Sequence, residues 1–299
     1  MTDTTSPTRR VIIDTDAKNE ADDQFAIVHA LLSETLDVRG LIAAHFGTER
    51  SATSMRDSRA EIDLLLRYLD MPHVSVADGA DRALPGETTP VDSPGARLIL
   101  EEAHRHGEGP LQIAFLGPLT DMATALLLDP SIARTDTTVI WIGGPGYHGT
   151  EPGESTEFNL RNDVDAANIV FRSGIRIWQV PRTAYVMTSV GYAELEEKVL
   201  PCGSLGKYLV RQLQEWNSTW HPGPIEHRAL GDSPAVGLML NPHGGQFRTM
   251  PAPTFSIEGG LLPGGTHTVR VCELYDGRYL LEDFFAKLRR FATATGENA

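Results

Sequence analysis

The sequence predicts an α/β protein with a doubly wound, mostly parallel central sheet that is covered by helices on both faces. The main observation is that short apolar runs alternate with longer segments of helical spacing from residue 11 to residue 180. Turn sequences such as Gly117-Pro118 and Gly143-Gly144 follow two of these runs, as expected where a strand ends. The chain also has 299 residues with 41% hydrophobic content, which is sufficient for a large core.

The first half of the chain contains the clearest strand and helix pairs. Val11–Ile13 is typical of a buried strand, and apolar residues at helical spacing from Phe25 to Leu32 predict a helix within Asp22–Ser33. By the same alternation we expect strands at Val38–Ala44, His73–Val76, Leu111–Leu116 and Val139–Ile142, and helices at Ser51–Leu69, Ala96–His106 and Leu119–Leu128.

The second half continues the alternation and then changes character. Asp232 is in an N-cap position, and Pro234 follows in the first turn, where its missing N–H is harmless. We expect helices at Asp163–Arg172, Ala193–Trp220, Ser233–Leu240 and Leu281–Phe291, a strand at Ile175–Val180, and antiparallel strands within Thr254–Arg270.

Composition restricts the partners and the compartment. The net charge of −14 argues against nucleic acids and anionic membranes, because both favour basic patches. No apolar stretch is long enough to span a bilayer. The polar segment 1–8 is expected to be a flexible tail, and residues 9–299 a single domain without linker or repeat. Cys202 and Cys272 form no disulfide framework or metal motif, so we expect a cytoplasmic protein.

The most informative motif is a group of acidic residues after the first strand. It runs Asp14-Thr15-Asp16, then Asn19-Glu20, then Asp22-Asp23 at the start of a helix. Carboxylates this close repel one another, and a hard divalent cation with oxygen ligands would offset that repulsion. The carboxyl ends of strands are also where open α/β sheets bind ligands. The alternative is a solvated acidic turn in which Asp22 or Asp23 caps the helix.

Three further motifs follow in chain order. Leu116-Gly117-Pro118-Leu119-Thr120 is a strand-to-helix turn whose carbonyls are available to a cation, although an ordinary turn fits equally well. In Glu157-Phe158-Asn159, a carboxylate and an amide flank an aromatic residue and can each bridge sugar hydroxyls, unless this is a plain acidic loop. Asp232, taken alone, is best explained as a helix cap.

Together these segments resemble the inosine–uridine preferring nucleoside hydrolase family. The resemblance covers most of the chain and depends on the order of several motifs rather than on one. The family has Asp-x-Asp followed by a short turn and Asp-Asp. It also has Leu-Gly-Pro-Leu-Thr-Asn, Met-Gly-Gly and Glu-Phe-Asn…Asp-x-x-Ala-Ala segments. Their counterparts are Leu116–Asp121, Ile142–Gly144, and Glu157–Asn159 with Asp163–Ala167.

The resemblance implies a Ca²⁺ site and a reaction. Asp16 would be a metal ligand and the catalytic base, taking a proton from water on the metal. The other protein ligands would be the carboxylates of Asp23 and Asp232 and the carbonyl of Thr120. The implied reaction is hydrolysis of the N-glycosidic bond of a ribonucleoside or related ribosyl compound through an oxocarbenium-like transition state.

The resemblance also implies a sugar site. The predicted substrate contacts are Asp22, Asn159, Glu157, His45, Asp232, Phe158 and Ile142. Asp22 and Asn159 would bind ribose hydroxyls, and Glu157 would hold the 5′ side of the sugar. His45 replaces the family's amide after the second strand; a core or surface histidine is the alternative. We expect a homodimer or homotetramer.

Two departures from the family pattern affect these expectations. The turn Ala17–Ala21 is two residues longer than usual, so that Lys18 or Asn19 can point inward. Purine-active members have a histidine before the last metal aspartate as leaving-group acid, whereas this chain has Gly231. Other candidate acids are His45, His148, His221 and His227. The alternatives are an easily departing leaving group, hydrolysis of a different metal-bound ester or glycoside, or a non-catalytic ribose- or nucleoside-binding protein.

Aromatic residues near the expected pocket mouth are candidates for stacking on a base, although most are expected in the core. They are Trp141, Tyr147, Phe158, Tyr185, Trp216 and Trp220.

Overall fold

The structure is a computed structural model that describes residues 8–105, 107–147, 156–221 and 223–296. Apart from Thr8, the predicted N-terminal tail lies outside these residues. Among the described helices, none is both long and apolar enough to cross a membrane.

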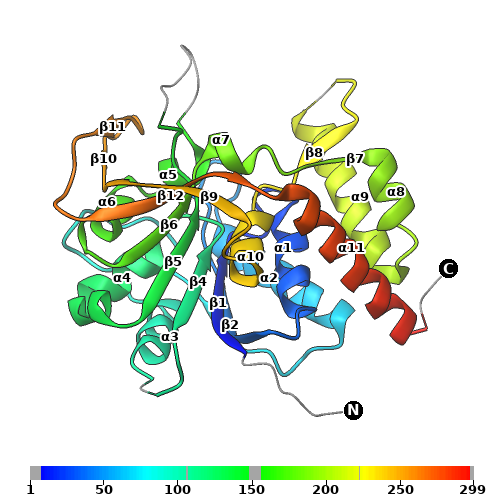
Figure 1. Ribbon diagram of the computed structural model, residues 1–299, viewed down its shortest axis with the longest axis horizontal. Coiled ribbons are helices and arrows are strands. Elements are labelled where there is room, and N and C mark those ends of the chain that lie inside the picture. Colours follow the sequence, from blue (N-terminus) through cyan, green and yellow to red (C-terminus); the bar gives the residue numbers. More distant parts are fainter. Residues whose placement is uncertain (1–7, 106, 148–155, 222, 297–299) are drawn as a thin grey trace.

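An eight-stranded sheet forms the centre of the molecule, in the order β3-β2-β1-β4-β5-β6-β12-β9 (Figure 1). Neighbouring strands pair in parallel, except that β9 is antiparallel to β12. Chain order reverses at β1, which pairs with β2 on one side and β4 on the other. The strands are β1 (Arg9–Thr15), β2 (Leu36–Ala43), β3 (Val76–Asp78), β4 (Leu111–Phe115), β5 (Thr137–Ile142), β6 (Arg176–Val180), β9 (Gly245–Pro251) and β12 (Thr268–Tyr275).

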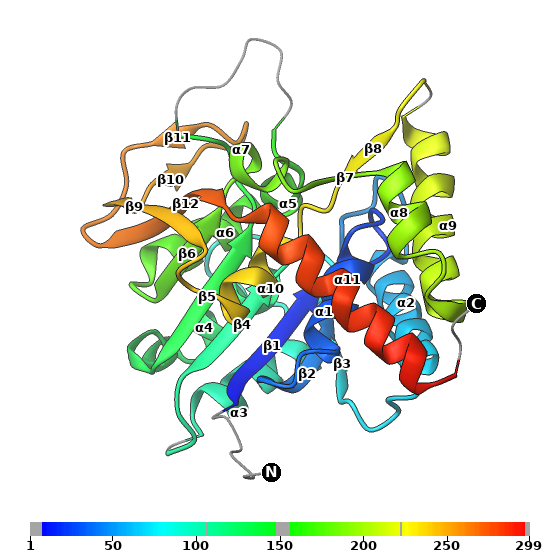
Figure 2. The same cartoon turned by 45° about the vertical axis from the view of Figure 1, so that its right-hand side comes forward.

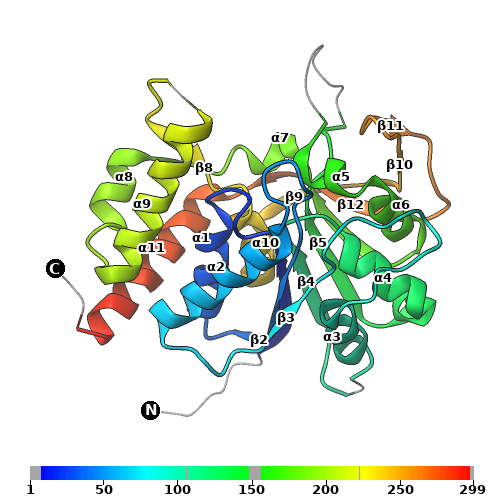
Figure 3. The same cartoon turned by 180° about the vertical axis from the view of Figure 1, so that it is seen from behind.

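Helices cover both faces of the sheet, as Figures 1, 2 and 3 show from three sides. Each face has its own apolar cluster. One contains α1 (Asp23–Leu31), α2 (Ser54–Leu69), α9 (Gly203–Trp220), α10 (Ser233–Leu240) and α11 (Gly277–Ala294). The other contains α3 (Pro94–Ala103), α4 (Thr120–Leu128) and α6 (Val164–Arg172). The predicted fold class is confirmed.

The long helix predicted over Ala193–Trp220 is wrong in one respect. The segment forms two helices, α8 (Tyr192–Lys198) and α9, because Pro201 between them lacks a backbone N–H and disfavours a helical residue before it. The short strand predicted at His73–Val76 begins only at Val76, where it pairs with Leu41 of β2.

The C-terminal third differs most from the expected pattern. The predicted antiparallel strands within Thr254–Arg270 are β10 (Thr254–Phe255), β11 (Leu261–Leu262) and the start of β12, and β9 was not predicted. All seven β9 residues keep some solvent exposure, so no apolar run marks this edge strand. The other unpredicted elements are the 3-10 helix η1 (Pro130–Arg134), α5 (Phe158–Asn162), α7 (Arg182–Tyr185), β7 (Ser189–Gly191) and β8 (His227–Ala229).

The chain reversal at β1 determines where a ligand pocket can form. Because β2 and β4 lie on opposite sides of β1, the connections that leave β1 and β4 separate at their carboxyl ends. Asp16 follows β1, and Gly117 follows β4. A Cβ atom at Gly117 would lie 3.0 Å from Cγ of Asp16, so the glycine permits this close approach.

Candidate active site

A pocket opens beyond the carboxyl ends of β1, β4 and β5. It contains all but two of the predicted site residues, the exceptions being Thr120 and His45. The lining residues are Asp16, Asn19, Glu20, Asp22, Asp23, Leu116, Ile142, Glu157, Phe158, Asn159, Tyr185, Gly231 and Asp232.

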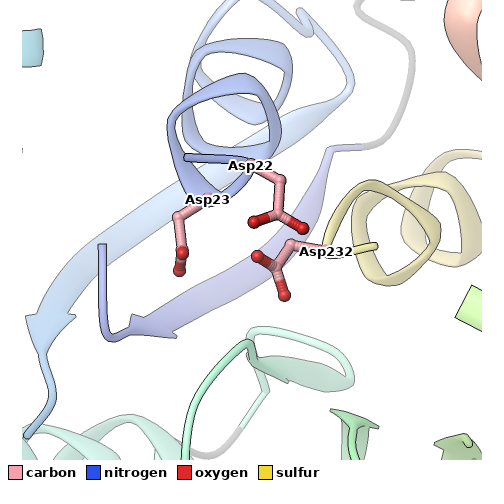
Figure 4. A group of neighbouring side chains, drawn as sticks. All are labelled: Asp22, Asp23 and Asp232. Atoms are coloured by element: carbon pink, nitrogen blue, oxygen red, sulfur yellow. The ribbon is translucent and has the colours of Figure 1, made fainter. Parts of the chain in front are cut away.

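Three carboxylates meet on one side of the pocket. One oxygen each of Asp22, Asp23 and Asp232 lies within 4.8 Å of the others. Asp22 and Asp23 stand at the start of α1 and Asp232 at the start of α10, so two helix N-termini place their acidic residues together (Figure 4). The positive ends of the helix dipoles favour this arrangement.

The capping explanation of these acids is not supported. Asp22 and Asp232 occupy the N-cap positions of α1 and α10, but neither side chain accepts a hydrogen bond from its own helix. Oδ2 of Asp22 instead accepts a hydrogen bond from the Gly231 N–H at 2.8 Å, which links the two helix starts. Oδ1 of Asp23 accepts one from the Thr15 hydroxyl at 2.5 Å. The carboxylates therefore remain directed to the pocket.

Asp16 adds a fourth carboxylate from the end of β1. It is 1% exposed, and its Oδ2 atom is buried without a hydrogen-bond partner in the described structure. A buried unpartnered carboxylate oxygen is unfavourable unless a ligand or cation completes it. Asp16 is thus available for a partner that the polypeptide does not supply.

The protonation behaviour of the four acids agrees with this view. Burial, followed by repulsion from the neighbouring carboxylates, raises the pKa of Asp16 and Asp232 well above the usual range. Burial likewise raises the pKa of Asp22 to about 6 and of Asp23 to about 8. The donors are all oxygens of charged or chargeable groups, which are the ligands that hard cations such as Ca²⁺ prefer. These residues therefore fit a divalent cation.

The same pocket is lined by Glu157 and Asn159, two of the predicted sugar contacts. Glu157 caps α5, and its two oxygens accept hydrogen bonds from the N–H groups of Gly144 (2.7 Å), Leu160 (2.9 Å) and Asn159 (3.2 Å). The Tyr185 hydroxyl donates to the same carboxylate at 3.0 Å. Burial and Glu157 raise the pKa of Tyr185 well above its usual value, so the phenol remains a donor. Glu157 is thereby held in one orientation.

Asn159 is also fixed by the fold. Its Nδ2 donates to the carbonyls of Leu116 at 2.6 Å and Ile142 at 2.9 Å, which join the ends of β4 and β5. Both donor hydrogens of the amide are used in this way, and its oxygen is the chemical group suited to accept from a hydroxyl.

The predicted role of His45 differs from its position in the structure. His45 is 1% exposed and does not line the pocket. The Gly47 N–H donates to its Nδ1 at 3.1 Å, so Nε2 carries the proton and donates to the Thr120 hydroxyl at 2.8 Å. Burial lowers the pKa of His45 to about 4, which keeps the ring neutral. The core-histidine alternative is the one the structure supports.

Thr120 is placed beside the site by the same contacts. Its hydroxyl donates to Oδ2 of Asp163 at 2.7 Å, which fixes the first residue of α4. The described contacts concern its side chain, so the role of its carbonyl as a metal ligand stays a prediction.

The long turn 17–21 builds the outer wall of the pocket. Lys18 points away and pairs with Glu61 at 2.9 Å. Asn19 faces inward, and its carbonyl accepts hydrogen bonds from Trp216 Nε1 and from Arg50, both at 3.0 Å. Glu20 forms ion pairs with Arg228 and, at 3.6 Å, with Arg50. Asn19 and Glu20 thus hold Arg50, Arg228 and Trp216 in place, and these side chains with Phe158 and Trp220 form the arginine–aromatic wall.

This wall contains residues that the sequence analysis missed. Arg228 lies over the Trp216 ring, 4.4 Å from its centroid, and 3.9 Å from Oδ1 of Asp22. Arg50 lies 4.6 Å from the centroid of Phe158. Neither arginine belongs to a recognisable motif, since Arg50 lies in the loop between β2 and α2 and Arg228 lies on the three-residue strand β8. Glu20 was within reach of prediction because it belongs to the acidic segment.

The other predicted aromatic and histidine residues divide between core and surface. Trp141 is fully buried and donates to the Gly117 carbonyl, and the Tyr147 hydroxyl donates to Gln179 at 2.5 Å, so both are structural. Trp220 is half exposed. Among the candidate acids, His221 lies 3.2 Å from Arg228, His227 is exposed on β8, and His148 lies outside the described residues.

Comparisons with known proteins identify the family of the chain. The family model described as inosine-uridine preferring nucleoside hydrolase matches residues 11–279. Probable uridine nucleosidase 2 of Arabidopsis thaliana is 27% identical over 225 residues, covering 69% of each chain. A pyrimidine-specific ribonucleoside hydrolase of Escherichia coli is 31% identical over 175 residues, covering 52% of this chain and 55% of that protein.

Solved structures show the same fold. A plant nucleoside hydrolase has a TM-score of 0.79 at 22% identity, covering 95% of this chain and 99% of that chain. A purine-preferring ribonucleoside hydrolase from Gardnerella vaginalis also has a TM-score of 0.79, at 21% identity, covering 96% and 100%. Given the match to residues 11–279, the chain belongs to the inosine-uridine preferring nucleoside hydrolase family and is a hydrolase acting on N-glycosyl compounds.

Proposed function

We propose that this protein is a Ca²⁺-dependent ribonucleoside hydrolase that releases ribose and a free base. The observation that carries the proposal is the pocket that Asp16, Asp22, Asp23 and Asp232 line together with Glu157. The fold offsets little of the negative charge of these four aspartates, whereas it supplies four hydrogen-bond donors to the Glu157 carboxylate. A cation on one side and a polyhydroxylated sugar on the other fit this distribution of charge.

The proposed chemistry divides the pocket residues into three roles. Asp16, Asp23, Asp232 and the Thr120 carbonyl would hold the cation. When bound, the cation supplies Lewis acidity that makes water in the site a better proton donor. Asp16 would accept the proton of the attacking water, and its unpartnered Oδ2 is the atom available for this. Asp22 and Asn159 would hold ribose hydroxyls, and Glu157 the 5′ hydroxyl.

The acidic surroundings also favour the reaction electrostatically. Breaking the glycosidic bond places positive charge on the ribosyl group, and carboxylates around the sugar stabilise that charge more than they stabilise the neutral substrate. We place the base beside Phe158 and the arginine–aromatic wall, since Phe158 lines the pocket next to Asn159.

We propose pyrimidine ribonucleosides as preferred substrates. Position 231 lacks the side chain that serves as leaving-group acid in the purine-active members of the family. The relatives named uridine nucleosidase and pyrimidine-specific ribonucleoside hydrolase support the same choice.

The test combines metal content with a substrate panel. Protein purified without chelator is analysed for bound metal, stripped with EGTA, and titrated with Ca²⁺ or Mg²⁺ while ribose release from uridine, cytidine and inosine is measured. We expect Ca²⁺ to restore uridine hydrolysis and to raise the free energy of unfolding, by about 2.7 kcal/mol at 100 times its Kd. Full activity after metal removal would contradict the metal dependence. Ribose binding without any hydrolysis would support the non-catalytic alternative.

We further propose a homo-oligomer, either a dimer or a tetramer, in a reducing cytoplasm. Cys202 and Cys272 are both free thiols and buried, as such a compartment permits. Light scattering coupled to size exclusion would test the assembly, and a monomer at micromolar concentration would contradict it.

A further inference from the structure

Gly231 lies where a side chain would collide with Tyr185. A Cβ atom built on Gly231 would be 2.8 Å from Cδ2 of the Tyr185 ring and 3.3 Å from Oδ2 of Asp22. A carbon contact below 3.0 Å requires one of the groups to move. Gly231 is not among the residues with positive φ, so crowding rather than backbone conformation explains the glycine.

The backbone holds the two residues in this relation. The Leu230 N–H donates to the Thr188 carbonyl at 2.7 Å, and the Thr188 N–H donates to the Tyr185 carbonyl at 3.1 Å. The segment that carries Tyr185 is therefore fastened to the segment that enters α10. These bonds fix the backbone of Tyr185 relative to Gly231, and the hydrogen bond from its hydroxyl to Glu157 holds the ring.

The far end of the same ring reaches the sugar side of the pocket. The Tyr185 hydroxyl donates to Oε1 of Glu157 at 3.0 Å, and the other described donors to this carboxylate are backbone N–H groups. Tyr185 thus spans the pocket from the helix start that carries Asp232 to the residue that caps α5. It lines the pocket between these points.

We infer that Tyr185 is a positioning residue, whose ring forms the pocket wall in place of a side chain at position 231 and whose hydroxyl orients Glu157. The catalytic part of this inference rests on the proposed function. The packing of the Tyr185 ring against Gly231 does not depend on any substrate. The ring and the hydroxyl have separate roles, so they can be removed separately.

The experiment measures kcat and KM on uridine for Tyr185→Phe, Tyr185→Ala and Gly231→Ala, and for Gly231→Ala in each tyrosine variant. Tyr185→Phe keeps the ring and loses one hydrogen bond to a carboxylate, so we expect KM to rise about tenfold with kcat within about twofold. Gly231→Ala should lower kcat/KM about tenfold in the wild type and in Tyr185→Phe. In Tyr185→Ala the same glycine change should cost less than about twofold, because the obstructing ring is gone.

The outcomes are distinguishable. An equal effect of Gly231→Ala in all three backgrounds would overturn the wall role, and an unchanged KM in Tyr185→Phe would overturn the orienting role. Thermal unfolding of the same six proteins is the readout that needs no activity: Gly231→Ala should lower Tm by about 2–4 °C only where the ring is present. If the wild type cleaves no nucleoside, the proposed function fails, while this Tm pattern still decides whether the ring occupies the space at position 231.

Discussion

The two ends of β1 contain buried acidic groups in opposite situations. Near its start, Glu102 is 3% exposed. It forms ion pairs with Arg10 at 2.9 Å, Arg39 at 3.1 Å and Arg105 at 2.7 Å. Although burial opposes ionisation, these cations hold the pKa of Glu102 below its usual value. Beyond its end, Asp16 is equally buried, and its pKa is raised by burial and by other carboxylates.

The comparison distinguishes a structural acid near the start of β1 from functional acids beyond its end. At the first end, the polypeptide supplies the countercharge, so the acid contributes to the stability of the fold. At the second end, Arg228 lies 3.9 Å from Asp22, but the pKa values of all four aspartates stay raised, so their mutual repulsion is relieved when a cation or a cationic transition state is present. Substitutions at the two ends should therefore change different properties.

The largest effect is expected for Asp16→Asn. The amide keeps the shape but cannot accept the proton of the attacking water, so kcat should fall by about 10⁴-fold. Loss of a repelling charge should leave the folded state at least as stable. Steady-state kinetics on uridine and thermal unfolding check both statements.

A matched control is available in Asp121, another fully buried aspartate whose carboxylate binds the Ala80 N–H and the Ser93 hydroxyl instead of lining the pocket. Asp121→Asn should retain most of the activity. Turnover of Asp16→Asn similar to that of this control would remove Asp16 from the base role.

The second largest effect concerns protonation of the leaving group in the pocket beyond the end of β1. Without a side chain at position 231 to donate a proton, inosine should be cleaved about 10²–10⁴-fold more slowly than nitrophenyl riboside, whose anion departs unprotonated. Comparison of kcat/KM on the two substrates measures the difference. Equal rates would show that another acid acts, and His227→Ala would then be the first variant to compare.

The third effect belongs to the structural end. Glu102→Ala leaves the buried Arg10 with the more distant and partly exposed Glu108, at 3.6 Å, in place of Glu102 at 2.9 Å, and should lower the free energy of unfolding by about 3 kcal/mol. The activity of the folded fraction should be unchanged. Because the pKa of Glu102 is lowered by folding, its contribution is present at neutral pH and disappears as the pH falls below about 4.

Urea unfolding of Glu102→Ala at pH 7 and at low pH tests this. Glu101 is a surface partner of Arg105, and its side chain is 64% exposed. Glu101→Ala should change the free energy of unfolding by less than about 0.5 kcal/mol. Similar losses in the two variants would mean that burial of Glu102 does not matter.

The smallest effects are expected on the sugar side of the pocket. Glu157→Ala and Asn159→Ala each remove a hydroxyl contact and should raise the free energy of the transition state by about 1–3 kcal/mol. Both residues also bind backbone groups, so thermal unfolding must accompany the kinetics. Unchanged kcat/KM in both variants would place the sugar elsewhere.

Much of the fold could be predicted because its signals are local. The apolar run at β1, the helical spacing of α1 and the Pro234 start of α10 appear in the sequence at the places where the structure has them. The edge strand β9 and the three-residue β8 could not be predicted, since partly exposed and very short strands have no apolar pattern.

By itself, the sequence determined the alternation of the main strands and helices up to β6 and the acidic residues that follow the strand ends. Those are properties of neighbouring residues. Only the tertiary structure decided that Asp22 accepts a hydrogen bond from Gly231, that His45 lies in the core with both ring nitrogens used, and that Tyr185 occupies the space beside Gly231. Gly231 and Asp22 are 209 positions apart, and their contact exists because α1 and α10 pack together with their N-termini at one edge of the sheet. Such contacts depend on how whole elements pack, which no local pattern of residues encodes.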